Sequence, residues 1–188
     1  RIARRYPQAE KRHCKSMKNI FLILIIFTSL ISNAQEKNNY YVGINGVSTT
    51  KGVFANSLIG LNFNKTKLQL GILVGSSFVN NETTVGLKGD FLYLPNEQRE
   101  SEFNFHFISS INYFKNSISV GSAETQTNTF QITFGYGFDY QIIKNLSFKS
   151  NIGLGSLVEI REFNFDTNSP KNKWGFAGLI TLGINYKL

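Results

Sequence analysis

From Tyr40 to the end of the chain, apolar and polar residues alternate with a period of two. Clusters of Asn, Gly, Lys and Ser interrupt the alternation at regular intervals, and no stretch keeps a helical period. In the clearest segment, 130–142, the apolar positions hold Phe, Ile or Tyr, and the positions between them hold Gln, Thr, Gly or Asp. Because successive side chains of a β-strand point to opposite faces, the pattern predicts strands with one apolar face.

The alternation predicts eight strands. They cover residues 40–47, 56–63, 67–77, 84–94, 103–114, 129–142, 146–159 and 174–188. We expect each to supply the roughly 9–11 tilted residues that cross a bilayer. An even number of strands brings both ends of the domain to the same side of a barrel.

The connections between these strands alternate in length. Polar segments predict tight turns at 64–66 and 143–145, and longer loops at 48–55, 115–128 and 160–173. With both termini in the periplasm, the tight turns fall on that side and the long loops fall outside. Two connections fit less well, because 95–102 is long for a periplasmic turn and 79–83 is short for an external loop.

The polar face of the strands decides between a membrane barrel and a soluble barrel with an apolar interior, since both show the same alternation. A soluble barrel needs Lys and Glu along its outer face, yet the polar positions hold mainly Asn, Gln, Ser, Thr and Gly. The charged residues within the strand centres are Lys88, Asp90, Asp139 and Lys149. Sparse charges of balanced sign suit an enclosed lumen in which they pair. The expected fold class is therefore all-β, an eight-stranded antiparallel transmembrane up-and-down β-barrel.

Aromatic residues are sorted by height along the predicted strands. One group lies near the expected periplasmic ends: Tyr40, Phe63, Tyr93, Phe103, Tyr140, Phe148 and Tyr186. A second group lies near the opposite ends: Tyr113, Phe130, Trp174 and Phe78. Rings with an apolar body and a polar tip favour the two membrane interfaces, whereas a soluble barrel has no reason to sort them.

A leader precedes the alternating region. The chain begins with Arg and Lys residues that show no periodicity, which we interpret as an over-long start or an expression remnant. From Met17 a short basic region and the apolar run 20–27 have the layout of a secretory signal, with cleavage expected after Ala34. A membrane anchor is the alternative, but the apolar region of about twelve residues is shorter than the ~20 that span a bilayer. The expected organisation is a start segment at 1–16, a signal peptide at 17–34 and a barrel domain at 35–188.

The formal charge of +8 comes mostly from the leader, where residues 1–34 hold seven Lys or Arg and one acid, a net of +6. The remaining residues hold 13 basic and 11 acidic side chains, a net of +2. A nucleic-acid partner needs its basic charge in the folded part and is therefore not expected. The one cysteine, Cys14, precedes the apolar run, so we expect no disulfide, Cys-based metal site or lipid anchor after it.

With this leader, eight alternating strands and a final strand Leu182-Gly183-Ile184-Asn185-Tyr186-Lys187-Leu188, the chain resembles the small eight-stranded outer-membrane β-barrels, the class of OmpX and the membrane domain of OmpA. The resemblance covers about residues 36–188. Its last strand looks like the C-terminal signal of the barrel-insertion machinery, although Leu188 stands where that signal usually ends in Phe. The resemblance implies a porin-like fold in the outer membrane of a Gram-negative cell envelope, with outer-membrane lipid and, during assembly, the insertion machinery as partners.

His106 is the one histidine after the leader, and the alternation places it on the lumen face with Ser110 four residues on. Barrel enzymes that cleave or transfer lipid acyl chains need a base within hydrogen-bond reach of a nucleophile. Four residues of strand separate these two by about 13 Å, so a lumen histidine in a hydrogen-bond network is the favoured interpretation. We expect no catalytic residue, no cofactor and no metal site, since one His without Cys cannot form a zinc-type cluster.

The remaining candidates concern the lumen and the loops. The four strand-centre charges favour paired plugs over an ion path, because an eight-stranded barrel is only wide enough for its own side chains. Inward glycines at spacing two are expected to make space for lumen side chains: Gly135, Gly137, Gly153, Gly155 and Gly183. The segments 115–128 and 160–166 are the strongest candidates for external contact. Phe163 and Phe165 either dock a partner or extend strand pairing above the membrane, and the continuing alternation favours extension.

The function expected from the sequence is an integral outer-membrane β-barrel protein without enzymatic activity. Its role would be structural, or a surface interaction through external loops whose partner the sequence does not name. Two alternatives stay open: a lipid-modifying outer-membrane barrel enzyme, and a secreted soluble barrel that binds an apolar ligand.

Overall fold

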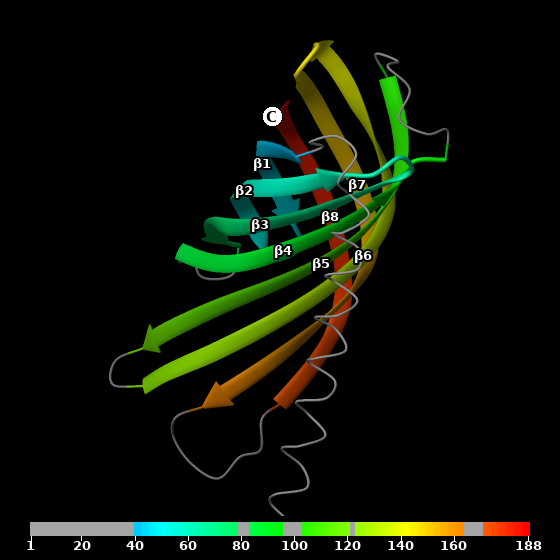
Figure 1. The fold of residues 1–188 in the computed structure, drawn as a ribbon. Helices are drawn as coiled ribbons and strands as arrows, with labels where there is room; N and C mark the ends of the chain where they lie inside the picture. The colour runs from blue at the N-terminus through cyan, green and yellow to red at the C-terminus, as the bar shows by residue number, and fades with distance from the viewer. Residues whose placement is uncertain (1–39, 79–82, 96–102, 121–122, 164–170) are drawn as a thin grey trace, which may run out of the picture. The chain divides into compact units, whose positions relative to one another are not determined.

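The computed structural model describes residues 40–78, 83–95, 103–120, 123–163 and 171–188, and the described part is an all-antiparallel β-barrel (Figure 1). Its strands are β1 (Tyr40–Thr49), β2 (Gly52–Asn62), β3 (Thr66–Ser77), β4 (Thr83–Tyr93), β5 (Phe103–Val120), β6 (Ala123–Ile143), β7 (Leu146–Phe163) and β8 (Lys171–Lys187). Each strand pairs with the next, and pairing of β8 with β1 closes the barrel. The predicted fold class is confirmed. The predicted segments at 1–16 and 17–34 lie outside the described residues.

The two ends of the barrel differ in their connections. At one end, called the termini end, β1 begins and β8 ends, and tight turns join β2 to β3 and β6 to β7. In the β2–β3 turn, the Phe63 amide donates to the Thr66 carbonyl at 2.7 Å. The tight turns predicted at 64–66 and 143–145 are confirmed to within a residue. The opposite end, called the hairpin end, carries the β1–β2, β3–β4, β5–β6 and β7–β8 connections.

The long loops predicted at the hairpin end are largely wrong. The β1–β2 connection is only Thr50 and Lys51, and pairing between β5 and β6 continues to Val120 and Ala123. β7 continues to Phe163, as the favoured extension predicts, whereas Phe165 lies outside the described residues. The polar residues of these segments led to the prediction of loops. A sheet that extends into water can keep its backbone hydrogen bonds without an apolar outer face, so strands can continue through polar sequence. In Figure 1 the β5–β6 hairpin reaches well past the β1–β2 hairpin.

The predicted orientation of the strand faces is confirmed. Phe134 in the middle of β6 is 64% exposed, whereas its neighbour Thr133 is 1% exposed. On β8, Phe176, Ile180 and Leu182 point outward. Large apolar side chains therefore cover the outer surface of the barrel and polar side chains fill most of its interior.

The sorted aromatic residues lie side by side in the barrel wall. At the termini end, Phe103 is paired with Tyr140, which is paired in turn with Phe148. Toward the hairpin end, Tyr113 packs on Phe130 with 4.9 Å between ring centroids. These contacts agree with the two predicted groups.

One part of the lumen is apolar, which the alternation did not predict. Five inward side chains form a buried cluster, called the lumen plug: Val47, Phe54, Leu73, Phe114 and Leu179. The rings of Phe54 and Phe114 stack with 4.7 Å between centroids. Because Val47 and Phe54 are paired next to the β1–β2 turn, the plug lies toward the hairpin end of the lumen.

Candidate functional site

The four charged residues predicted in the lumen are all buried, and Lys88 forms an ion pair with Asp90 on the same face of β4. Ser110 lies opposite Asp90 on β5. Its hydroxyl donates to Asp90 Oδ1 at 2.6 Å and accepts from the Lys88 ammonium at 2.9 Å. This triad satisfies two buried charges with side chains of adjacent strands, as a plug requires.

The other two predicted charges do not pair with each other. Asp139 on β6 accepts from the Lys67 ammonium at 2.6 Å, and the Lys149 ammonium donates to the Gln69 side-chain carbonyl. Gln69 donates in turn to the Tyr41 hydroxyl at 2.6 Å. Lys67 was not predicted as a lumen charge because it is the first residue of a predicted strand. Its position, two residues before Gln69, nevertheless places it on the same inward face.

A further ion pair lies at the hairpin end. Lys51 in the β1–β2 turn pairs with Glu159 of β7, whose side chain is nearly buried. Lys51 falls in the predicted loop 48–55, where the alternation of the strands assigns no face, so the sequence did not predict this ion pair. Together with the lumen plug, this pair occupies the hairpin side of the interior.

His106 is fully buried and forms a hydrogen bond with Asn151, with 2.7 Å between Nε2 and Oδ1. Ser110 belongs instead to the Lys88–Asp90 triad. The hydroxyl and the imidazole therefore lie in separate networks, and their arrangement is not that of a nucleophile bonded to its base. Within the described ranges, no group of three or more His, Cys, Asp or Glu is placed to hold a metal ion.

Several buried polar side chains in the lumen form no hydrogen bond with any residue that the structure describes. They include both polar atoms of Asn45 and Asn112 and the hydroxyls of Thr133 and Thr181. Buried polar groups in proteins are almost always bonded to protein or to water. The middle of the lumen is thus suited to internal water rather than to an apolar ligand.

The inward glycines fall into two kinds. A Cβ at Gly183 would overlap the side-chain amide of Asn45, so this glycine makes space for a lumen side chain as predicted. A Cβ at Gly137 would overlap both the Asn151 amide and the Ser150 carbonyl oxygen. A Cβ at Gly135 or Gly155 would instead overlap a backbone carbonyl of the adjacent strand. These two glycines permit the close approach of β6 and β7.

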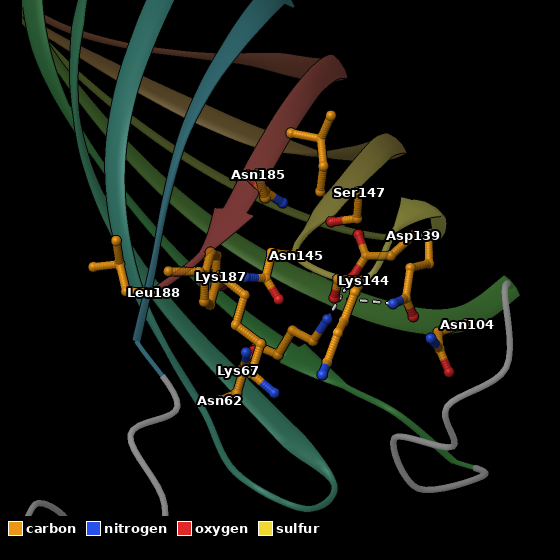
Figure 2. Close-up of a pocket in the computed structure, with 13 residues that line it drawn as sticks. Asn62, Lys67, Asn104, Asp139, Lys144, Asn145, Ser147, Asn185, Lys187 and Leu188 are labelled. Atoms are coloured by element: carbon orange, nitrogen blue, oxygen red, sulfur yellow. Dashed lines mark hydrogen bonds and ion pairs between the residues drawn. The ribbon is translucent and has the colours of Figure 1, made fainter.

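At the termini end the lumen opens into a cavity of about 780 Å³ (Figure 2). Its wall is mainly polar and includes Tyr41, Lys67, Asp139, Lys144 and Lys187. Three of these residues also take part in the buried interactions of the lumen: Tyr41 accepts a hydrogen bond from Gln69, and Lys67 forms an ion pair with Asp139. Sequence reasoning identified Asp139 but not the cavity, because its wall comes from the ends of strands that are far apart in the chain.

The described residues contain no helix long and apolar enough to cross a membrane. The barrel is similar in structure to the N-terminal β-barrel domain of Pseudomonas aeruginosa OprF, with a TM-score of 0.58 and 10% sequence identity over 81% of this chain and 98% of that chain. It is also similar to Neisserial surface protein A (NspA), with a TM-score of 0.55 and 11% identity over 80% of this chain and 97% of that chain. No protein-family model and no curated protein matches the sequence. The chain has the fold of the eight-stranded outer-membrane barrels, which confirms the resemblance at the level of the fold.

Proposed function

We propose that the protein is an integral outer-membrane β-barrel without enzymatic activity, with a structural or surface-interaction role. The observation that carries this proposal is the sorting of side chains in a closed barrel. Residues such as Phe134 and Ile180 are exposed on the outer surface, whereas charged residues such as Lys88 and Asp90 are buried inside. An apolar outer surface around a polar interior is stable in lipid and unstable in water.

The arrangement weighs against a soluble carrier of an apolar ligand. Such a carrier needs an apolar interior and a polar outside, which is the reverse of what Phe134 and Thr133 show. Buried apolar side chains are the minority inside the barrel, and besides the lumen plug they include Leu58, Leu92 and Ile108. In the plug, the rings of Phe54 and Phe114 stack on each other.

The surface-interaction part of the proposal rests on the hairpin end. There β8 continues from Leu179 to Lys171 without a partner in β1, because their pairing ends at Thr49. Strands β5 to β8 therefore rise together above the shorter β1–β4 side. An extended sheet exposed above the membrane is a suitable place for contact with an external partner.

Three measurements test the proposal. Unheated protein in detergent should migrate differently on a gel from heated protein, and its extraction from cells should require detergent. Release of folded protein into buffer without detergent would support the soluble carrier instead. A lipid deacylation assay on the wild type and His106→Ala should show no activity in either protein, whereas activity that the substitution abolishes would favour the enzyme.

A further inference from the structure

The cavity at the termini end has more cationic than anionic groups in its wall. Three lysines line it, Lys67, Lys144 and Lys187, and Asp139 is the one acidic side chain in its lining. Lys67 and Asp139 neutralise each other at 2.6 Å. Lys144 and Lys187 are exposed, and neither forms an ion pair with a residue in the described ranges. Two lysine side chains without an ion pair among the described residues therefore lie at the mouth, beside the C-terminal residue Leu188.

The backbone holds these two lysines near one another. Lys144 lies in the β6–β7 turn, and Lys187 ends the neighbouring strand β8. The Lys187 amide donates to the carbonyl of Asn145, the residue after Lys144, at 2.8 Å. Figure 2 shows both lysines at the same opening, together with Lys67.

The inner end of the cavity is also close to a buried cation. Tyr41 lines the cavity and accepts a hydrogen bond from Gln69, which accepts in turn from the Lys149 ammonium. Lys149 is fully buried and forms no ion pair with a carboxylate among the described residues. Inside a barrel wall, away from bulk water and salt, the field of such a charge is weakly screened. Asp139, which is paired with Lys149 across β6 and β7, and Asp90 each form an ion pair with another lysine. The inner wall therefore holds three ammonium groups against two carboxylates, an excess of one positive charge.

We propose that this cavity binds a small soluble solute that carries at least two carboxylate or phosphate groups. One anionic group would meet Lys144 and Lys187 at the mouth, and the second would lie deeper, where Lys67, Lys88 and Lys149 outnumber Asp90 and Asp139 by one charge. Asn145 and Ser147 also line the wall and can donate hydrogen bonds to anionic oxygens. The volume lies within the range of small-molecule sites. This site is additional to the proposed membrane location. It depends on that location only in that the compartment at the termini end supplies the solute.

The test is calorimetric titration of the refolded full chain in a non-ionic polyoxyethylene detergent, whose head group carries neither sugar nor charge. Citrate and pyrophosphate serve as multivalent probes, acetate as a monovalent probe and spermidine as a cation, all at constant ionic strength. We expect saturable binding of one or both multivalent anions, with acetate at least about tenfold weaker and no binding of spermidine. The stronger of citrate and pyrophosphate identifies a carboxylate or a phosphate ligand.

Two double variants distinguish binding in this cavity from nonspecific attraction of anions to a basic protein. Lys144→Gln/Lys187→Gln should weaken the multivalent anion about tenfold. Lys115→Gln/Lys173→Gln removes the same charge from exposed lysines of β5 and β8 toward the hairpin end and should leave affinity unchanged. Heat-dependent gel migration verifies that each variant is folded. Absence of saturable binding in the wild type, or equal weakening in both variants, would overturn the inference and leave the membrane-barrel proposal untouched.

Discussion

At the scale of single residues, the polar side chains of the lumen act mainly through their partners. Residue parity along each strand was enough to predict that Lys88, Asp90, Asp139 and Lys149 face inward. Parity could not predict the pairing, because partners are set by strand register and by the length of each side chain. Lys67 reaches Asp139 from a strand that is not its neighbour in the barrel, so only the closed structure brings them together.

Asp139→Ala should lower the free energy of unfolding, because it leaves the Lys67 ammonium without its carboxylate in a nearly buried position. Loss of one partner of a buried pair costs roughly 3–5 kcal/mol, and lumen water reduces this to an expected loss of about 2–3 kcal/mol. Urea unfolding from lipid vesicles measures the change. The double variant Lys67→Met/Asp139→Leu removes both charges and should recover most of the loss. An unchanged midpoint for Asp139→Ala would mean that the pair contributes nothing.

Phe134→Arg should destabilise the barrel by about 2–4 kcal/mol, the cost of placing a cation on the lipid face near the bilayer midplane. Phe134 is outward-facing and central on β6, paired with Ser109 and Leu154. Asn172→Arg is the control, since Asn172 is exposed near the start of β8 at the hairpin end. Unfolding from vesicles should separate the two variants clearly. Equal stability would place Phe134 away from lipid.

At the scale of strands, the sequence predicted the number of strands and the orientation of each face, but not where strands end at the hairpin end. Apolar and polar residues alternate along a strand because one face contacts lipid and the other faces the lumen. The alternation is lost where β5, β6 and β7 extend past the lipid. The lumen plug was missed for a related reason. Val47 and Phe54 are apolar side chains on the inward face, where the pattern leads one to expect polar residues.

Two glycines of β7 provide a matched test of strand approach. At Gly155 a Cβ would overlap the carbonyl oxygen of Ile132, whereas at Gly153 the nearest atom, the Phe134 carbonyl oxygen, lies 3.3 Å away. Gly155→Ala should therefore cost at least about 2 kcal/mol more than Gly153→Ala, because the β6 and β7 backbones must separate. Parallel unfolding titrations of the two variants check this. Equal losses would show that β6 and β7 do not approach closely at Gly155.

At the scale of the whole molecule, the interior changes in character from one end to the other. The termini end holds a polar cavity, the middle holds buried charge pairs and amides, and the hairpin side holds the apolar plug. The sequence predicted a filled lumen from the narrowness of eight strands. It could not predict this order, because each level combines inward residues from strands that are distant in the chain.

A barrel filled in this way should not conduct ions steadily. The stacked rings of Phe54 and Phe114 and the buried Lys88–Asp90 pair lie inside the lumen, and an eight-stranded barrel is only wide enough for its own side chains. Purified protein in planar bilayers should show no large, steady current. A stable current of the size that porins carry would mean that the lumen charges line an open path.

Fractionation of cells that express the full chain tests most directly whether the apolar outer surface lies in lipid. After separation of inner membrane, outer membrane and soluble fractions on a density gradient, the folded, heat-modifiable protein should sediment with the outer membrane and resist alkaline extraction. Folded protein in the soluble fraction, or release from the membrane by alkaline buffer, would contradict an integral outer-membrane barrel.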